Sequence, residues 1–383
     1  MIRLGNTIEF SVILPAKNEE TTIADCISKI VEVFRRENIK GEIIVADSST
    51  DKTPEIARRM GVKVVKSPTE GYGSAYMAGF EAAKGEYILM GDADDTYDFH
   101  EIPRFIKFLR ENKADLVLGS RVKGRILPNS MPWLHRYIGN PLLSFILNTF
   151  FGASISDVHT GFRAIRRDAF EKLDLHATGM EFASEMIVKA VKKKLRIAEV
   201  PITYHPRKAQ SKLSSFSDGW RHLRFMLLYS PDYLFIIPGT LMFIVALVLL
   251  LALVPGPVTI AGTTLDLHPM IIASLLAIVG FQVLIMGLFT KTYAVVSHLE
   301  EEDKLIEFIY KHLSLEKASF LGIMMIVLGV ILSFDIIYLW VLSNFGPLFE
   351  VRRALFSSTL IILGVQAIFS AFFLSILVLP KKE

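Results

Sequence analysis

Hydrophobic residues follow different patterns in the two halves of the chain. Up to about residue 230, short apolar runs alternate with stretches of helical periodicity. Beyond it, long apolar runs cover about 233–254, 269–290, 318–342 and 355–379. The first, second and fourth runs contain no Asp, Glu, Lys or Arg, and a helix of that length crosses the ~30 Å of a bilayer's hydrocarbon. The pattern therefore predicts four membrane spans in an all-α domain.

The first half reads as strands alternating with helices. Strands are predicted at 8–15, 42–46, 62–66 and 87–90, and helices at 20–37, 53–60 and 73–83. Asn18 or Glu19, just before the first helix, is expected to begin it. Such alternation is typical of a Rossmann-like α/β domain with a mostly parallel sheet and helices on both faces. We expect this domain at 1–215, a juxtamembrane helix at 216–232 and the transmembrane domain at 233–383.

Composition and charge support this division. Of the 383 residues, 51% are hydrophobic and 21% charged, and residues 1–232 hold 34 of the 42 Lys and Arg and 29 of the 39 Asp and Glu. A net charge of +3 without a nucleic-acid-binding motif argues against a nucleic-acid partner. The single cysteine, Cys26, excludes an intrachain disulfide and a cysteine metal site.

Basic residues near the span ends predict the orientation. Eleven Lys and Arg lie before span one, between spans two and three and at the C-terminus, against Arg352 and Arg353 on the other side. The positive-inside rule then places the first domain and the C-terminus in the cytoplasm of a multi-pass cell-membrane protein. Asp335 lies inside span three, where we favour a helix cap or interhelical hydrogen bond over a functional site.

Two segments outside the spans have interfacial character. Phe216, Trp220, Leu223 and Leu227 share one helical face, which is typical of a helix in the headgroup plane. Residues 131–151 are rich in Trp, Leu, Ile and Phe, but their apolar run is too short to span. That segment either dips into the inner leaflet or packs in the core, and we favour the membrane surface.

Polar clusters follow three predicted strands, at 16–19, 47–51 and 91–95. Ligands bind beyond the carboxyl ends of strands in such sheets, so these clusters predict a nucleotide site. Asp92 and Asp94 have the spacing to share Mg²⁺ or Mn²⁺ with a bound diphosphate. Asp47 is expected to accept from a base N–H, and Lys17 either contacts a phosphate or is a solvated loop lysine.

Several ordered motifs carry a family resemblance. They are Ser11-Val-Ile-Leu-Pro-Ala-Lys-Asn-Glu-Glu20, Ile44-Val-Ala-Asp-Ser-Ser-Thr-Asp51, Gly91-Asp-Ala-Asp94, Asp157-Val-His-Thr-Gly-Phe-Arg163, Glu199-Val-Pro-Ile-Thr-Tyr-His-Pro-Arg207 and Ser211-Lys-Leu213. The first three resemble the GT-A glycosyltransferases of family 2. The rest match its polyprenyl-phosphate hexosyltransferases, similar to dolichol-phosphate mannose and glucose synthases, some of which carry C-terminal spans.

The resemblance implies roles for individual residues. It implies donor contacts at Pro15, Glu19 and Asp47, metal binding at Asp92 and Asp94, and acceptor-phosphate binding at Arg121, Arg136 and Arg207. To these we add Lys17 and Asp92 for the donor, Thr96 for the metal and Lys212 for the acceptor phosphate, and we expect catalysis to depend on Asp94, Arg121, Asp157 and Arg207. Asp157 either anchors an arginine, contacts the donor sugar or caps a loop. The chain departs from the family at Asp95 and Thr96, where Leu-Gln is common. Glu181 and Glu185 lie one helical turn apart, and we expect them to orient Arg163 or Arg207.

These features predict an inverting, metal-dependent transfer of a hexose from a nucleotide sugar, UDP-glucose or GDP-mannose, to polyprenyl phosphate at the cytoplasmic leaflet. A processive polysaccharide synthase is the nearest alternative, but the Gln-x-x-Arg-Trp string of those enzymes is absent from the sequence. A catalytically inactive lipid-handling protein is another, and the intact Asp92 and Asp94 argue against it. Small residues in the spans, such as Gly322 and Gly329, permit packing against another span or a second copy of the chain.

Overall fold

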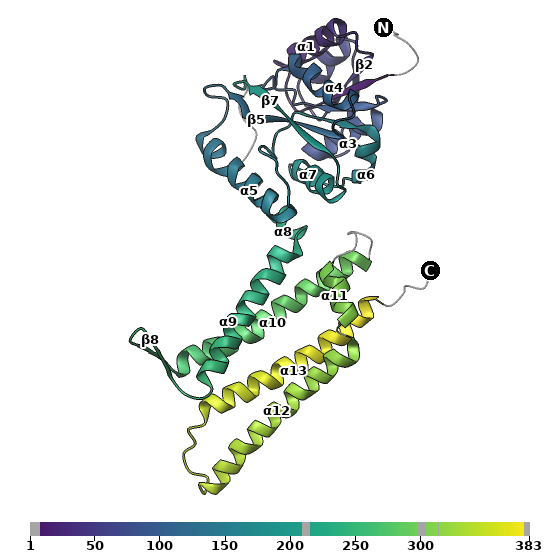
Figure 1. The fold of residues 1–383 in the computed structure, drawn as a ribbon. Coiled ribbons are helices and arrows are strands. Elements are labelled where there is room, and N and C mark those ends of the chain that lie inside the picture. The colour runs from purple at the N-terminus through teal and green to yellow at the C-terminus, as the bar shows by residue number, and fades with distance from the viewer. Residues whose placement is uncertain (1–7, 209–214, 297–303, 313, 379–383) are drawn as a thin grey trace. The chain divides into compact units, whose positions relative to one another are not determined.

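The chain forms two units in a computed structural model, which describes residues 8–208, 215–296, 304–312 and 314–378 (Figure 1). The first unit covers Met1–Tyr229 and the second Ser230–Glu383. We describe each unit separately.

A seven-stranded, mostly parallel sheet forms the centre of the first unit. Its strands are β1 (Phe10–Ala16), β2 (Gly41–Asp47), β3 (Lys63–Lys66), β4 (Tyr87–Met90), β5 (Leu116–Ile126), β6 (Arg163–Arg166) and β7 (Ile197–Tyr204), in the order β3-β2-β1-β4-β6-β5-β7. Only β6 runs antiparallel to its neighbours in this sheet. The four predicted strands and the α/β class are confirmed.

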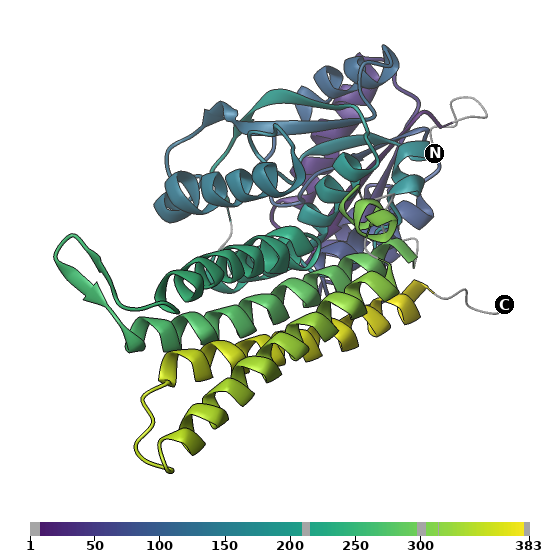
Figure 2. The same ribbon diagram turned by 60° about the horizontal axis from the view of Figure 1, so that its bottom comes forward.

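Helices cover both faces of the sheet (Figure 2). They are α1 (Ile23–Arg36), α2 (Thr53–Arg59), α3 (Tyr72–Ala82), α4 (Ile102–Arg110), α5 (Asn140–Phe151), α6 (Arg167–Leu173), α7 (Phe182–Lys192) and α8 (Ser215–Leu228). One apolar core lies between the sheet and α1, α2 and α4, and a second lies beneath α3, α5, α6, α7 and α8. These helices shield both faces of the sheet from water. The strands are therefore continuous apolar runs in the sequence.

Helix α1 begins later than predicted. The sequence predicted a helix from Glu20, begun by Asn18 or Glu19, but the helix starts at Ile23, and Asn18 has a left-handed backbone with φ of 55°. The Glu19 N–H donates to Thr53 Oγ1 at 2.9 Å, which holds the preceding residues in a loop. Tertiary hydrogen bonds therefore move the start of the helix by about one turn.

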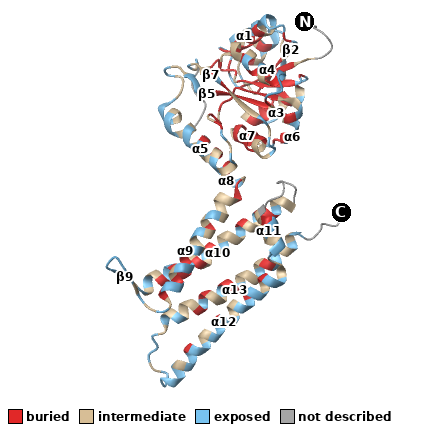
Figure 3. Ribbon diagram, in the orientation of Figure 1, coloured by how far each residue is buried: buried red, intermediate tan, exposed pale blue. Residues whose placement is uncertain are grey.

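The second unit consists of long apolar helices. They are α9 (Ile237–Leu253), α10 (Leu267–Val296), α11 (Lys304–His312), α12 (Leu315–Leu342) and α13 (Val351–Val378), with a hairpin of β8 (Val258–Ile260) and β9 (Thr263–Leu265). Four helices, Asp232–Leu253, α10, α12 and α13, have the length and composition to cross a membrane, as predicted. Exposed residues recur along these helices (Figure 3), and many of them are large and apolar: Leu241 is 63% exposed, Leu275 60% and Phe369 71%. This surface is suited to lipid rather than water.

Glycines allow two of these helices to approach closely. A Cβ on Gly322 would lie 2.7 Å from the carbonyl oxygen of Gly364, and one on Gly329 would lie 2.7 Å from that of Ser357. The small residues that the sequence left without an assigned partner therefore pack α12 against α13 of the same chain. Near the other end of this helix pair, Arg353 Nη1 lies 3.4 Å from Asp335 Oδ2. This contact is the interhelical hydrogen bond that we favoured for Asp335.

Helix α8 packs against the rest of the first unit through one face. His222, Phe225 and Met226 are buried against the first unit, whereas Trp220 is 54% exposed. Exposed apolar residues also gather before and along α5: Trp133, Leu134, Tyr137, Ile138, Leu142 and Phe145. Exposure on this scale rarely occurs in a water-facing helix. The membrane-surface placement of both segments stays a prediction.

Candidate active site

The predicted nucleotide site lies at one edge of the sheet. Strands β2, β1 and β4 are parallel neighbours, so the segments that follow them emerge together. Ser48 N–H donates to the Ala16 carbonyl at 2.9 Å, and Gly91 N–H donates to that of Ile13 at 3.3 Å. The structure therefore brings the three polar clusters to the same edge.

Asp92 and Asp94 follow β4 and are held by neighbouring hydroxyl groups. Tyr72 donates to Asp92 Oδ1 at 3.2 Å, and Thr96 donates to Asp94 Oδ1 through its hydroxyl at 2.6 Å and its N–H at 3.1 Å. Burial and the nearby Asp94 carboxylate raise the pKa of Asp92 to about 7. A cation bound at this position would stabilise the charged form of Asp92.

This pair suits a hard divalent cation. The structure shows no cluster of three or more Asp, Glu, His or Cys side chains with metal-binding geometry among the residues it describes. Mg²⁺ commonly uses one or two carboxylates together with substrate phosphates and water, so Asp92 and Asp94 fit this mode. Thr96 is buried against Asp94. Whether the Thr96 hydroxyl is itself a ligand stays a prediction.

Arg207 extends from the segment after β7 to these carboxylates. Its Nη2 donates to Glu19 Oε1 at 2.8 Å, and its Nε lies 3.4 Å from Asp94 Oδ2, an ion-pair distance. Glu19 is 5% exposed. The guanidinium thus lies directly beside the candidate metal pair, where it could meet an anionic acceptor.

Arg121 and Asp157 form a buried bidentate ion pair. Arg121 Nε and Nη2 donate to the two carboxylate oxygens at 2.7 and 2.8 Å, and its backbone N–H donates to Oδ2 at 3.0 Å. Burial lowers the pKa of Arg121, but the Asp157 carboxylate outweighs it and raises that pKa well above its ordinary value. The guanidinium carbon also lies 5.2 Å from the centre of the Tyr204 ring. The Arg121 guanidinium is therefore held in place by Asp157 before any ligand binds.

Other predicted residues have separate surroundings. Lys17 is half-exposed and pairs with Glu70 at 3.0 Å. Asp47 is buried at the end of β2 and accepts the Ser49 N–H at 3.2 Å, and Pro15 is partly buried in β1. Arg136 lies in a π-helical turn, His135–Gly139, and stacks over Tyr137 at 5.3 Å. Lys212 lies outside the described residues.

The prediction that Glu181 and Glu185 orient Arg163 or Arg207 is wrong. Glu185 accepts from the N–H groups of His176 and Ala177, and Glu181 accepts from that of Gly179, so both carboxylates stabilise the loop before α7. Arg163 instead donates to three backbone carbonyls, those of Val158, Thr160 and Ala183. Loop carbonyls and backbone N–H groups leave no signal in the sequence, which is why the helical spacing of the glutamates misled the prediction.

A histidine cluster connects α8 to the loop that carries Asp157. The rings of His159 and His222 lie 4.4 Å apart, and Ser184 Oγ lies 2.8 Å from His222 Nδ1. His159 Nδ1 is buried and has no hydrogen-bond partner among the residues that the structure describes. Burial, His222, Arg121 and Arg163 lower the pKa of His159 well below its ordinary value of 6.5.

This depressed pKa predicts a pH-dependent stability. Between pH 6.5 and the folded-state pKa, His159 is protonated in the unfolded chain but neutral in the folded protein. The free energy of unfolding therefore falls as pH falls, by up to about 1.4 kcal/mol per pH unit. Thermal unfolding in detergent from pH 8 to 5 measures this. His159→Asn should flatten the slope, whereas His176→Asn, at a largely exposed ring, should not. Parallel slopes for wild type and His159→Asn would contradict the expectation.

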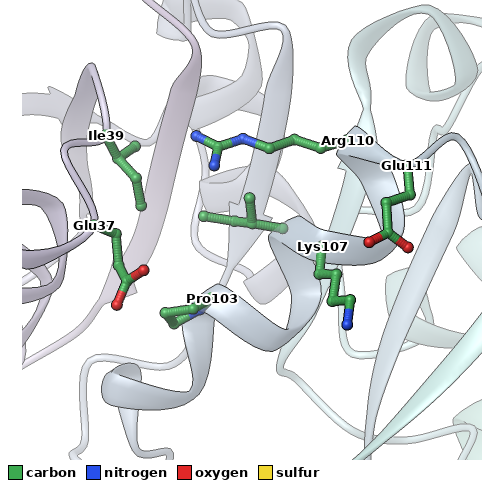
Figure 4. Close-up of a pocket in the computed structure, with 7 residues that line it drawn as sticks. Glu37, Ile39, Pro103, Lys107, Arg110 and Glu111 are labelled. Carbon is green, nitrogen blue, oxygen red and sulfur yellow. The ribbon is translucent and has the colours of Figure 1, made fainter.

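Two hollows in the first unit lie apart from these carboxylates. One, of about 310 Å³, lies between the end of α1 and α4 and is lined by Glu37, Ile39, Pro103, Lys107, Arg110 and Glu111 (Figure 4). The other, of about 430 Å³, lies between α8 and the loop before α7, where Arg221, Arg224 and Glu181 line it. Neither contains a predicted donor, metal or acceptor residue.

Known proteins share these features. Residues 11–174 match the model described as "Glycosyl transferase family 2", and 288–378 match "Glycosyltransferase family 2 C-terminal transmembrane region". The chain is 43% identical to the low-salt glycan biosynthesis hexosyltransferase of Haloferax volcanii, over 95% of this chain and 88% of that protein. It is 32% identical to a dolichyl-phosphate hexose transferase of the same organism, over 55% of this chain and 89% of the relative.

Solved structures also match part of the chain. Glucosyl-3-phosphoglycerate synthase from Mycobacterium tuberculosis, in complex with Mn²⁺, uridine diphosphate and glucosyl-3-phosphoglycerate, aligns with a TM-score of 0.48 and 22% identity. The alignment covers 60% of this chain and 86% of that one.

Proposed function

Because the chain belongs to glycosyltransferase family 2 and carries the family's C-terminal transmembrane region, we propose that it transfers a hexose from a nucleotide sugar to polyprenyl phosphate. The observation that carries the proposal is the position of Arg207, which lies beside Asp94 and so adjoins the candidate metal and diphosphate site. An arginine placed there suits an acceptor that is itself a phosphate. The names of the two Haloferax relatives, a hexosyltransferase and a dolichyl-phosphate hexose transferase, also support it.

The chemistry places modest demands on the protein. A lipid phosphate is already ionised at neutral pH, so it can attack the anomeric carbon without a general base. As the new C–O bond forms, the bond from that carbon to the nucleoside diphosphate breaks, and attack from the opposite face inverts the centre. An α-linked donor then gives a β-linked product. Positioning and charge neutralisation supply most of the rate increase in such a reaction.

The residues divide these tasks. Arg207, which contacts Glu19, would hold acceptor phosphate oxygens near the reacting carbon, and Arg121, which contacts Asp157, would supply a second guanidinium. Asp92 and Asp94 would hold Mg²⁺ or Mn²⁺, which when bound neutralises the negative charge on the leaving diphosphate. Asp47 and Pro15, at the ends of β2 and β1, would contact the donor.

The orientation of the protein belongs to the same proposal. We place the first unit and the C-terminus in the cytoplasm because Lys and Arg concentrate on that side of the spans. Nucleotide sugars are soluble substrates of that compartment, and a lipid acceptor in the cytoplasmic leaflet would present its phosphate to the first unit.

A radiolabel transfer assay tests the function. Purified protein in detergent receives dolichyl phosphate and Mn²⁺, with UDP-glucose, UDP-N-acetylglucosamine or GDP-mannose in separate reactions. We expect a mild-acid-labile, organic-phase product from one donor. A polymeric product would favour a processive synthase, and the absence of product from all common nucleotide hexoses, with folded protein confirmed, would sink the proposal.

A further inference from the structure

Asp95 follows the candidate metal pair but faces a different group of residues. Its carboxylate oxygens lie 2.5 Å from Lys29 Nζ and 2.9 Å from Lys208 Nζ. The residue is 9% exposed, and its backbone is left-handed with φ of 63°. A left-handed residue reverses the chain direction locally, which accounts for adjacent carboxylates having different partners.

One face of helix α1 contacts the loop that carries Ala93 and Asp95. Thr22, Cys26 and Lys29 are spaced at i, i+4 and i+7, so they line one side of the helix start. Thr22 Oγ1 and Cys26 Sγ donate to the Ala93 carbonyl at 2.7 and 3.5 Å, and Lys29 pairs with Asp95. Asp95 is therefore anchored on a rigid element before Lys208 is considered.

Lys208 connects this anchor to the segment that carries Arg207. Its Nζ lies 2.9 Å from Asp95 Oδ2 and 2.8 Å from Asp25 Oδ2 on α1. Three residues earlier, the His205 N–H donates to the Thr96 carbonyl at 2.9 Å. The loop that follows β4 and carries residues 92–96 is here called the metal loop. The segment 205–208 is thus attached to the metal loop at both ends, with Arg207 between the two attachments.

We propose that the Lys29–Asp95–Lys208 ion triad, here called the Asp95 bridge, is a positioning device that holds Arg207 over the metal loop for acceptor-phosphate binding. This inference rests on the proposed function. Asp95 acts through Arg207 and Lys208 and touches no substrate itself. A flexible arginine loses much conformational entropy when it binds a phosphate, and anchoring the neighbouring residue reduces that cost in advance.

A competing explanation is that Lys208 binds the acceptor phosphate directly. The two explanations differ in what removal of the Asp95 charge does. If Lys208 bound phosphate, Asp95→Asn would release it and leave acceptor affinity unchanged or improved. If the Asp95 bridge positions Arg207, Asp95→Asn and Lys208→Met break the same contact, so each weakens acceptor binding and their effects do not multiply.

The test compares Asp95→Asn, Lys208→Met and the double variant in the full-length protein. Asn tolerates the left-handed backbone, and Met keeps the length of a half-exposed lysine, so the fold should survive both changes. We expect KM for dolichyl phosphate to rise about tenfold in each single variant and equally in the double variant, the loss of one charged hydrogen bond. The Kd for UDP with Mn²⁺ should stay within twofold. Lys113→Met is the control. Lys113 forms an exposed ion pair with Glu111 before β5, so its loss should change neither value.

Several results would overturn the inference. They are an unchanged KM in either single variant, a multiplied loss in the double variant, or a parallel loss of UDP affinity. A wild-type protein that makes no glycolipid would defeat the proposed function instead. The Asp95 bridge is then decided by hydrogen exchange, because Asp95→Asn should speed exchange of the His205 amide and Lys113→Met should not.

Discussion

Asp94→Asn should lower hexose transfer by about 10³-fold or more. The substitution keeps the size of the side chain but removes half of the carboxylate charge available to a divalent cation, and it removes the charge that attracts Arg207. Initial rates with saturating donor and dolichyl phosphate measure the change. Calorimetric titration of Mn²⁺ in the presence of UDP provides a second readout, in which the variant should bind Mn²⁺ at least about tenfold more weakly.

Asp98→Asn is the matched control for this experiment. Asp98 lies four residues further along the same segment, but its carboxylate caps a short helix by accepting the His100 N–H at 3.0 Å. Asn is also a good cap, so activity should stay near the wild-type level. Activity of Asp94→Asn within tenfold of wild type would remove Asp94 from the metal site, and an equal loss in both variants would indicate damage to the segment as a whole.

Asp157→Ala should destabilise the first unit by about 3–5 kcal/mol, because it leaves the buried Arg121 guanidinium without its carboxylate partner. The same change should reduce transfer at least about 100-fold, since Arg121 loses the two hydrogen bonds that orient it. Chemical denaturation in detergent, followed by tryptophan fluorescence and compared with transfer rates, measures the two effects.

A double variant separates the structural effect from the functional one. In Arg121→Met/Asp157→Leu neither charge of this buried pair remains, so stability should recover to within about 2 kcal/mol of wild type. Transfer should stay as low as in the single variant, because the second guanidinium is gone. Recovery of both stability and transfer would show that the ion pair only supports the fold.

The strand and helix pattern was predictable because its physical cause is local. Burial on both faces makes β1, β2 and β4 continuous apolar runs, and the membrane spans are apolar on all sides, so both signals survive without tertiary information. Family membership was predictable for a similar reason, since the motifs are short ordered strings. The start of α1 was not, because Glu19 and Thr53 meet only in the folded chain.

The candidate site was predictable only in part. Strand order brings the polar clusters of β1, β2 and β4 together, and parallel α/β topology made that convergence expected. The partners of most charged groups were not expected: Glu19 pairs with Arg207, and Asp95 pairs with Lys29 and Lys208. These contacts join residues far apart in the sequence, and no periodicity records them.

The sequence by itself determined the two-unit organisation, the α/β class, the four apolar helices and the residue types available at the carboxyl edge of the sheet, because hydrophobic periodicity and short motifs are local properties. Only the tertiary structure decided which charges meet. It directed Asp95 away from Asp94 and toward two lysines, gave Arg163 to backbone carbonyls, and packed Gly322 against Gly364. Each of these contacts depends on distances between segments that only the folded chain brings together.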